Sequence, residues 1–198
     1  MQLERLLQSL DPVPNPRARE EQYTTPAGIA AEVLYIARAK GDIADRSVAD
    51  LGCGNGVLAI GAKLLGARRV LGLDSESTSI EAARGNALRL RVEVEWRLAD
   101  VRETVGTFET VVMNPPFGSQ TRHADRAFLE TAVRLGGVVY TFVNAKAEEF
   151  VRRALESAGR TVTDRLEYRF PIPHMFEFHR EPTHDVNVLL FRAAVAKG

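Results

Sequence analysis

The stretch VADLGCGNGVLAIGA, residues 48–62, decides the fold, because it joins an apolar strand, a glycine-rich turn and the start of a helix. The glycines Gly52, Gly54 and Gly56 allow the backbone to turn tightly and to approach a ligand closely. The following helix directs its N-terminal amide groups towards the turn. We therefore expect a strand–helix unit of an open parallel sheet, with a ligand site where the strand ends.

An acidic residue ends the next apolar strand, RVLGLD, and lies about 20 residues after the glycine turn. A carboxylate at this position, Asp74, can hold both ribose hydroxyls of a nucleoside. The glycine spacing also fits a relaxed dinucleotide fingerprint, so an NAD-dependent dehydrogenase stays an alternative. Asp50, directly before the turn, favours S-adenosylmethionine, because an acid there suits a cationic amino-acid ligand better than a pyrophosphate.

Strands and helices alternate along the rest of the chain. Further strands are predicted at 92–96, 108–114, 137–144, 161–173 and 184–195, and helices at 2–10, 25–41, 56–67, 76–90, 123–135 and 146–159. This order predicts an α/β fold with a mostly parallel seven-stranded sheet, helices on both faces and a C-terminal antiparallel hairpin. We expect one domain over residues 1–198, with a helical and proline-rich extension over 1–22 and the core over 23–198. Thr25 is predicted to cap the helix that starts there.

Composition indicates a cytoplasmic protein with no membrane segment, because no apolar run could span a bilayer and the N-terminus is charged. Cys53 is the only cysteine, which excludes an intramolecular disulfide and a cysteine zinc cluster. A small residue inside a glycine turn is more typical of tight packing than of a nucleophile. The net charge of zero neither requires nor excludes a nucleic-acid partner.

A second motif, NPPFGSQ at residues 114–120, follows the apolar strand FETVVM. Neither proline has an N–H group, so the turn offers backbone carbonyls and the Asn114 side-chain oxygen as acceptors, beside the flat face of Phe117. These groups suit an exocyclic amino group on a planar base or amide. Two acceptors can direct the nitrogen lone pair towards an electrophile such as a sulfonium methyl group, while Phe117 stacks on the ring.

Together, DLGCGNGVLAIGA, NPPFGSQ and EEQYTTP (residues 20–26) resemble the Rossmann-like class I methyltransferases that modify exocyclic nitrogens. More narrowly, they resemble the archaeal and eukaryotic adenine-N6 methyltransferases of small-subunit rRNA. LERLLQSL, ADRAFLETA and FPIPHMFEFHR extend the resemblance over nearly the whole chain. It implies S-adenosylmethionine as cofactor and adenine N6 in structured RNA as the acceptor.

The resemblance also implies two groups of site residues. The catalytic group, which would receive the target adenine, is Asn114, Pro115, Pro116 and Phe117. Together with Asp50, the cofactor-binding group is Gln22, Tyr23, Thr25, Gly52, Cys53, Gly54, Asn55, Gly56, Val57, Asp74, Ser75, Asp100 and Val101. The family tends to have a second aspartate two residues after the ribose acid, where this chain has Glu76.

Basic and aromatic residues suit single-stranded RNA. The candidates are Arg17, Arg19, Arg122, His123, Arg126, His174, Phe176, Phe178, His179 and Arg180. A solvated helix face is the alternative for Arg126, and the histidine spacing fits no metal site, so we expect no metal. The resemblance further implies a small zinc-binding activator protein that adds a strand near VEVEW, residues 92–96, although Glu93 and Glu95 could instead protect that edge.

Three other functions stay open. The acceptor could be an adenine of tRNA or DNA, or a glutamine amide of a protein, because NPPF does not separate these acceptors. The chain could also be a non-catalytic, cofactor-binding scaffold of a ribonucleoprotein. The presence of both Asn114 and Asp74 argues against the scaffold, since a protein without turnover is free to lose them.

Overall fold

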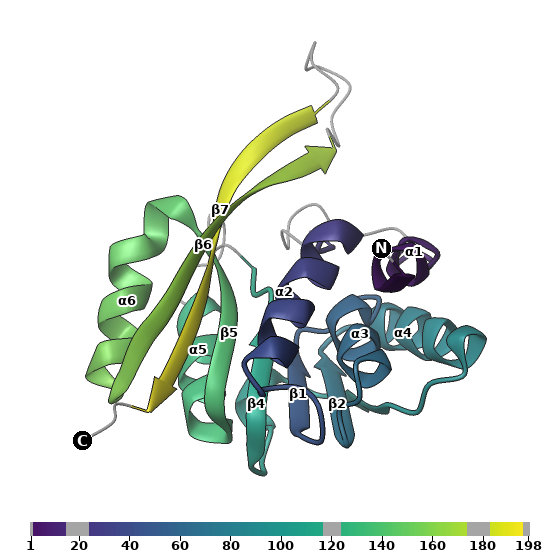
Figure 1. The fold of residues 1–198 in the computed structure, drawn as a ribbon, viewed down its shortest axis with the longest axis horizontal. Helices are drawn as coiled ribbons and strands as arrows, with labels where there is room; N and C mark the ends of the chain where they lie inside the picture. The colour runs from purple at the N-terminus through teal and green to yellow at the C-terminus, as the bar shows by residue number, and fades with distance from the viewer. Residues whose placement is uncertain (1, 15–23, 117–123, 174–182, 196–198) are drawn as a thin grey trace.

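A seven-stranded sheet organises the computed structural model, which describes residues 2–14, 24–116, 124–173 and 183–195 (Figure 1). The strand order is β3-β2-β1-β4-β5-β7-β6. The parallel strands are β1 (Ser47–Leu51), β2 (Arg69–Asp74), β3 (Glu95–Leu98), β4 (Phe108–Met113) and β5 (Gly136–Asn144). The last two, β6 (Arg160–Pro173) and β7 (Thr183–Val195), form an antiparallel hairpin, with β7 antiparallel to β5. The predicted α/β fold class is confirmed.

Helices cover both faces of the sheet, because successive residues of a buried strand point to opposite sides. On β1, Val48 belongs to one buried cluster and Ala49 to the other. The first cluster includes α1 (Gln2–Gln8), α2 (Ala27–Ala39), α3 (Val57–Leu64) and α4 (Ser77–Leu90). The second includes α5 (Ala124–Leu135) and α6 (Glu148–Ser157). Two short 3₁₀ turns, η2 (Val101–Glu103) and η3 (Ala145–Ala147), complete the helical elements of the described residues. Within the described residues, we find no helix with the length and apolar content that crossing a membrane requires.

The strand predicted at 92–96 is wrong in position, since β3 covers Glu95–Leu98. Arg91 ends α4 in the left-handed conformation (φ 55°), and the Val92 amide donates to the Ala87 carbonyl at 3.0 Å. Val92 therefore closes the C-terminus of α4, and the pairing with β2 starts only at Glu95. Their apolar alternation comes from valines that pack against the first cluster.

Thr25 is not the cap of α2, contrary to the sequence-based expectation. Pro26 is the N-cap residue, and no side-chain cap hydrogen bond to this helix is found among the described residues. The Thr25 hydroxyl instead contacts a residue at the end of β4, as described below.

The β6–β7 hairpin extends beyond the rest of the sheet. Pairing between β5 and β7 ends at Asn144 and Val188, whereas β6 and β7 stay paired as far as Pro173 and Thr183. In Figure 1 the hairpin rises past the carboxyl ends of the parallel strands. The Tyr168 hydroxyl, 3.2 Å from the Glu32 carboxylate, connects it to α2.

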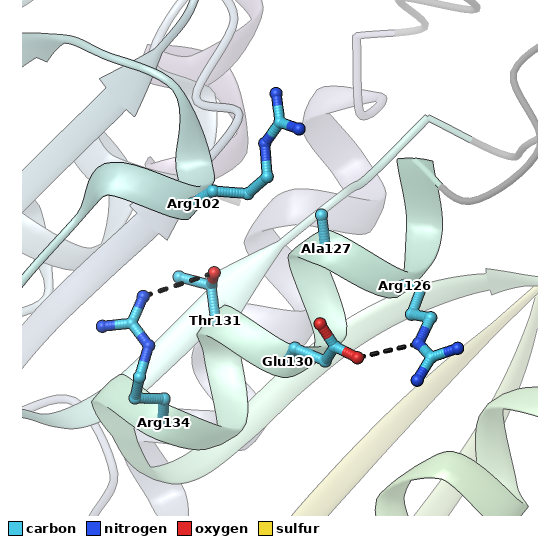
Figure 2. Close-up of a pocket in the computed structure, with 6 residues that line it drawn as sticks. All are labelled: Arg102, Arg126, Ala127, Glu130, Thr131 and Arg134. Carbon is cyan, nitrogen blue, oxygen red and sulfur yellow. Dashed lines mark hydrogen bonds and ion pairs between the residues drawn. The ribbon is translucent and has the colours of Figure 1, made fainter.

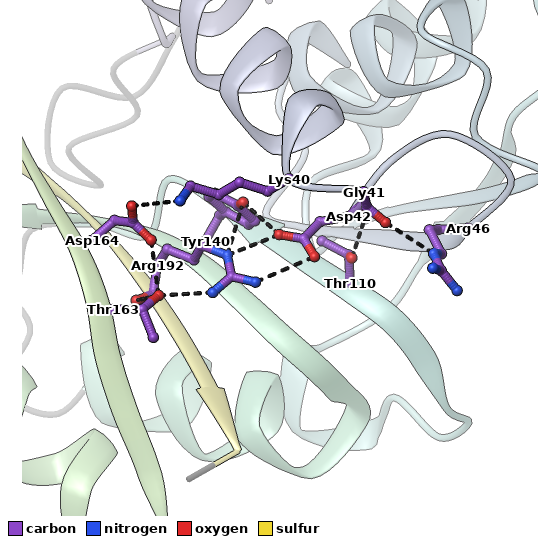
Figure 3. A network of polar contacts seen from close by, with 9 residues as sticks. All are labelled: Lys40, Gly41, Asp42, Arg46, Thr110, Tyr140, Thr163, Asp164 and Arg192. Carbon is purple, nitrogen blue, oxygen red and sulfur yellow. Dashed lines mark hydrogen bonds and ion pairs between the residues drawn. The ribbon is translucent and has the colours of Figure 1, made fainter. Parts of the chain in front are cut away.

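A polar network ties the connection between α2 and β1 to the central strands (Figure 3). The Asp42 carboxylate accepts from the Tyr140 hydroxyl at 2.7 Å and from Arg192 Nε at 2.8 Å, and its backbone carbonyl accepts from the Thr110 hydroxyl at 2.6 Å. Burial and the adjacent carboxylate raise the pKa of Tyr140, which therefore stays a donor. The network joins β4, β5 and β7 around one buried carboxylate.

Candidate active site

Three adjacent parallel strands bring the predicted cofactor and acceptor residues to one edge of the sheet. In the register, Leu51 of β1 lies opposite the residues that directly precede Asp74 on β2 and Asn114 on β4. Leu51 is followed by Gly52, the first glycine of the turn. The glycine turn, the predicted ribose acid and the catalytic asparagine therefore lie side by side at the carboxyl ends of the strands, where ligands bind in open α/β sheets.

The glycines of the turn serve two purposes, although all have positive φ (Gly52 72°, Gly54 53°, Gly56 86°). A Cβ atom at Gly56 would lie 2.8 Å from Trp96, and one at Gly52 would lie 3.0 Å from Phe128, so close packing excludes a side chain at both. A Cβ atom at Gly54 would meet no described heavy atom within 4 Å. Gly54 is therefore the glycine at which a ligand can approach the backbone.

Asp74 is held rigidly at the end of β2. Its Oδ2 accepts from the Gly54 amide at 2.9 Å, and its Oδ1 accepts from the Glu76 amide at 3.0 Å. Burial raises the pKa of this carboxyl, while the two backbone hydrogen bonds act in the opposite direction. Each oxygen has a second lone pair, so the carboxylate can also accept from the hydroxyls of a ribose.

Asp50 lies beneath the glycine turn and is 1% exposed. Its Oδ2 accepts from the Ala59 amide at 2.9 Å. This bond caps the N-terminus of α3, because the N-cap residue, Gly56, has no side chain that could do so. Its Oδ1 is buried without a hydrogen-bond partner among the described residues. Burial raises the pKa of Asp50 to about 7. An unsatisfied buried acceptor of this kind fits a cationic or donor ligand.

Asn55 is fixed by residues that the sequence did not indicate. Its Nδ2 donates to the Asp11 carbonyl at 3.1 Å, and Asn86 Nδ2 donates to the Asn55 carbonyl at 3.0 Å. Asn86 also exchanges hydrogen bonds with the backbone of Asp11. The segment after α1 and the helix α4 thus brace the glycine turn, while Asn55 Oδ1 is a second buried acceptor without a partner among the described residues.

The remaining predicted cofactor residues lie at the glycine turn and directly after β2 and β3. Cys53 is buried, which raises the pKa of its thiol and fits packing better than nucleophilic attack. Asp100 accepts from Nε and from the backbone amide of Arg102, both at 2.9 Å, and these bonds lower its pKa to about 2. Val57 and Val101 are buried.

The acceptor motif meets the N-terminal segment. Asn114 is half-buried, and its Nδ2 donates to the Thr25 hydroxyl oxygen at 3.1 Å. Thr25 is itself buried. Pro115 is buried and Pro116 is half-buried. Thr25, which was expected to line the cofactor pocket, therefore contacts the predicted catalytic side chain directly.

Several predicted site residues lie outside the described residues. They are Arg17, Arg19, Gln22, Tyr23, Phe117, Arg122, His123, His174, Phe176, Phe178, His179 and Arg180. Arg126 is described and lies exposed in the first turn of α5, where its Nε donates to Glu130 Oε1 at 2.7 Å. Phe128 is a further residue at the site, because it packs against Gly52, and its spacing on an amphipathic helix gave no signal of this role.

Comparisons with known proteins find relatives over nearly the whole chain. The methyltransferase small domain family matches residues 30–164. The chain is 41% identical to the uncharacterised protein MJ0284 of Methanocaldococcus jannaschii, over 96% of this chain and 91% of that protein. It is 33% identical to the rRNA N(6)-adenosine-methyltransferase Mettl5 of Drosophila melanogaster, over 96% and 93%. The solved structure of PH1948, a candidate RNA methyltransferase from Pyrococcus horikoshii, superposes with a TM-score of 0.92 at 36% identity, covering 99% of this chain and 97% of that one.

Proposed function

This chain belongs to the methyltransferase small domain family, and we propose that it transfers the methyl group of S-adenosylmethionine to N6 of an adenine in ribosomal RNA, specifically small-subunit rRNA. The observation that supports this most strongly is the placement of Asn114, in a donor-poor proline turn, next to the glycine turn and Asp74. Similarity to an rRNA adenosine methyltransferase over nearly the whole chain supports adenine as the acceptor.

The cofactor fits the residues at the carboxyl edge. Asp74 would accept from the ribose hydroxyls, and Gly54 leaves space for the cofactor to approach the backbone. The buried acceptors of Asp50 and Asn55 suit the charged methionine end, and Asp100 with Val101 would flank the adenine ring. When bound, S-adenosylmethionine supplies an electrophilic methyl group on a cationic sulfur.

The acceptor side of the site would act by orientation. An adenine amino nitrogen is a poor nucleophile, because its lone pair is delocalised into the ring. Oδ1 of Asn114 and the Pro115 carbonyl would accept the two amino hydrogens, which directs the lone pair out of the turn and stabilises the positive charge that develops on nitrogen. The prolines donate no competing backbone hydrogen bond. Phe117 would stack on the adenine ring.

Two further points belong to this proposal. A small zinc-binding activator protein would pair with an edge of the sheet. The strand β3 is such an edge, and its Leu98 is 55% exposed.

The cytoplasm is the expected location, because ribosomal RNA is the proposed acceptor.

The acceptor can be identified directly. The protein is incubated with radiolabelled S-adenosylmethionine and with separate rRNA, tRNA, DNA and protein fractions, and the labelled fraction is digested to nucleosides or amino acids. We expect label in 6-methyladenosine from rRNA. Label in methylglutamine, or only in tRNA or DNA, would reject the proposed acceptor while keeping the methyltransferase chemistry.

A further inference from the structure

A hollow of about 340 Å³ lies between α5 and η2 (Figure 2). Its lining residues are Arg102, Arg126, Ala127, Glu130, Thr131 and Arg134, and we call it the arginine groove. Arginines outnumber acidic residues three to one in this lining, although the whole chain has 26 basic and 26 acidic residues. The positive charge is therefore a local property of the groove.

The arginine groove is formed by elements that also contribute to the proposed active site. Phe128 of α5 packs against Gly52 of the glycine turn, so the first turns of α5 touch the cofactor side. Arg102 is bonded to Asp100, which was predicted to flank the cofactor adenine. The helix α5 follows the NPPF turn along the chain. A strand that delivers a base to Asn114 would therefore have the groove within reach of its neighbouring nucleotides.

The arginines at the rim can bind an anion without losing their present partners. Nε of Arg126 donates to Glu130, and Nε of Arg102 donates to Asp100. A guanidinium group has five N–H donors, and these side chains are 66% and 73% exposed. Figure 2 shows them on η2 and α5 with the small side chain of Ala127 between them in this view.

The inner end of the groove is fixed by Arg134. Its Nη1 donates to the Thr104 carbonyl at 2.7 Å and so joins the last turns of α5 to the residue after η2. Its Nη2 lies 3.5 Å from the Thr131 hydroxyl. The Arg134 side chain thus links the two walls through one hydrogen bond to a backbone carbonyl, and it brings a third positive charge to the groove.

We propose that the arginine groove binds phosphates of the RNA strand next to the target adenine, an inference that rests on the function proposed above. Guanidinium groups match phosphate oxygens in geometry and charge, and phosphate contacts position a strand without reading its sequence. The Glu130 carboxylate opposes phosphate binding at Arg126 by charge repulsion, because its negative charge lies beside the same guanidinium in a weak, exposed ion pair. Removal of the Glu130 charge therefore strengthens RNA binding.

A fluorescently labelled oligouridine tests the groove, because it has phosphates and no adenine. Anisotropy at low salt is expected to show roughly three- to tenfold weaker binding for Arg102→Gln and for Arg126→Gln, and tighter binding for Glu130→Gln. Each arginine variant should lower the slope of log Kd against log salt concentration by about 0.7. Thermal unfolding of each variant confirms that the fold is intact.

The chain provides a matched control on α6. Arg153 and Glu149 form an exposed pair with the same spacing, at 2.8 Å against 2.7 Å for Arg126 and Glu130. Arg153→Gln and Glu149→Gln are expected to leave oligouridine binding unchanged. Equal effects at the two pairs, no tightening by Glu130→Gln, or no measurable oligouridine binding by the unaltered protein would overturn the proposal.

Methylation of adenine-containing rRNA by the same preparations separates this inference from the proposed function. If the unaltered protein methylates rRNA, but the arginine variants bind oligouridine with the same affinity as the unaltered protein, the phosphate site in the groove is rejected and the proposed function is kept. If the oligouridine pattern holds and no RNA is methylated, the proposed function is rejected and the phosphate site stands.

Discussion

Asn114, at the end of β4, donates its side-chain amide to the hydroxyl oxygen of Thr25, 3.1 Å away and 89 residues earlier in the chain. The contact sets the orientation of the carboxamide that is proposed to receive the target amino group. The segment before α2 therefore helps to position the proposed catalytic side chain.

Thr25→Val tests this positioning role, because it removes the hydroxyl and keeps the shape. Loss of one hydrogen bond of about 1 kcal/mol is expected to lower kcat for methylation roughly fivefold, with the Kd of S-adenosylmethionine unchanged in calorimetry. Thr25→Ser keeps the hydroxyl and should restore most of kcat. A higher cofactor Kd with unchanged kcat would instead make Thr25 a cofactor contact.

Gly54→Ala tests the approach of the cofactor to the glycine turn, with Gly41→Ala as its control. Both glycines have positive φ, 53° and 79°, and neither has a heavy atom of the described residues within 4 Å of an ideal Cβ. Each substitution is therefore expected to cost about 1 kcal/mol of unfolding free energy from backbone strain. Only Gly54→Ala should weaken S-adenosylmethionine binding, and equal binding by both variants would contradict the assigned site.

Asp50 predicts a pH dependence of stability in the cofactor-free protein. Burial raises its pKa from 3.8 to about 7, so the folded state binds a proton more tightly than the unfolded state. The part of the unfolding free energy that comes from protonation of Asp50 is fully present below pH 3.8. It is lost as pH rises towards about 7, where the buried carboxylate must ionise. Asp50→Asn keeps an acceptor for the Ala59 amide and should flatten this decline in urea-unfolding experiments. An identical pH profile for the variant would show that other groups cause the decline.

The Asp42 network predicts a large effect of one arginine on stability. Arg192 and Asp42 are 16% and 11% exposed at their side chains, so Arg192→Met leaves a buried carboxylate without its cation. The expected loss is about 3–5 kcal/mol in urea unfolding. Arg165→Met is the control, because it removes the exposed ion-pair partner of Glu148. This variant should lose no more than about 1 kcal/mol of unfolding free energy. Similar losses for both variants would mean that burial of the network contributes little.

Much of the fold could be predicted from local patterns. The helix and strand positions follow from periodicity and from glycines such as Gly41 and Gly66, which lie just beyond the ends of α2 and α3 with φ of 79° and 94°. The β3 position was predicted wrongly, because Val92 and Val94, which pack against the first buried cluster before the strand begins, alternate in the same way as strand residues. Periodicity reports burial, and it does not report which backbone groups pair.

The sequence could predict only those site residues that stand out within one short stretch of the chain. Asp74 and Asn114 each end an apolar strand, so the sheet topology brings them together. The support of Asn55 by Asp11 and Asn86 depends on tertiary packing between segments 44 and 31 residues away, which no spacing rule reveals. The same holds for the arginine groove, whose charges come from η2 and α5.

The central claim is that Asn114 acts on the acceptor and not on the cofactor. The most direct measurement compares Asn114→Ala with the unaltered protein, by calorimetry with S-adenosylmethionine and by single-turnover formation of 6-methyladenosine in rRNA. We expect the variant to bind the cofactor with nearly unchanged Kd and to form no detectable 6-methyladenosine. Methylation at the unaltered rate, or loss of cofactor binding equal to the loss of methylation, would contradict the account.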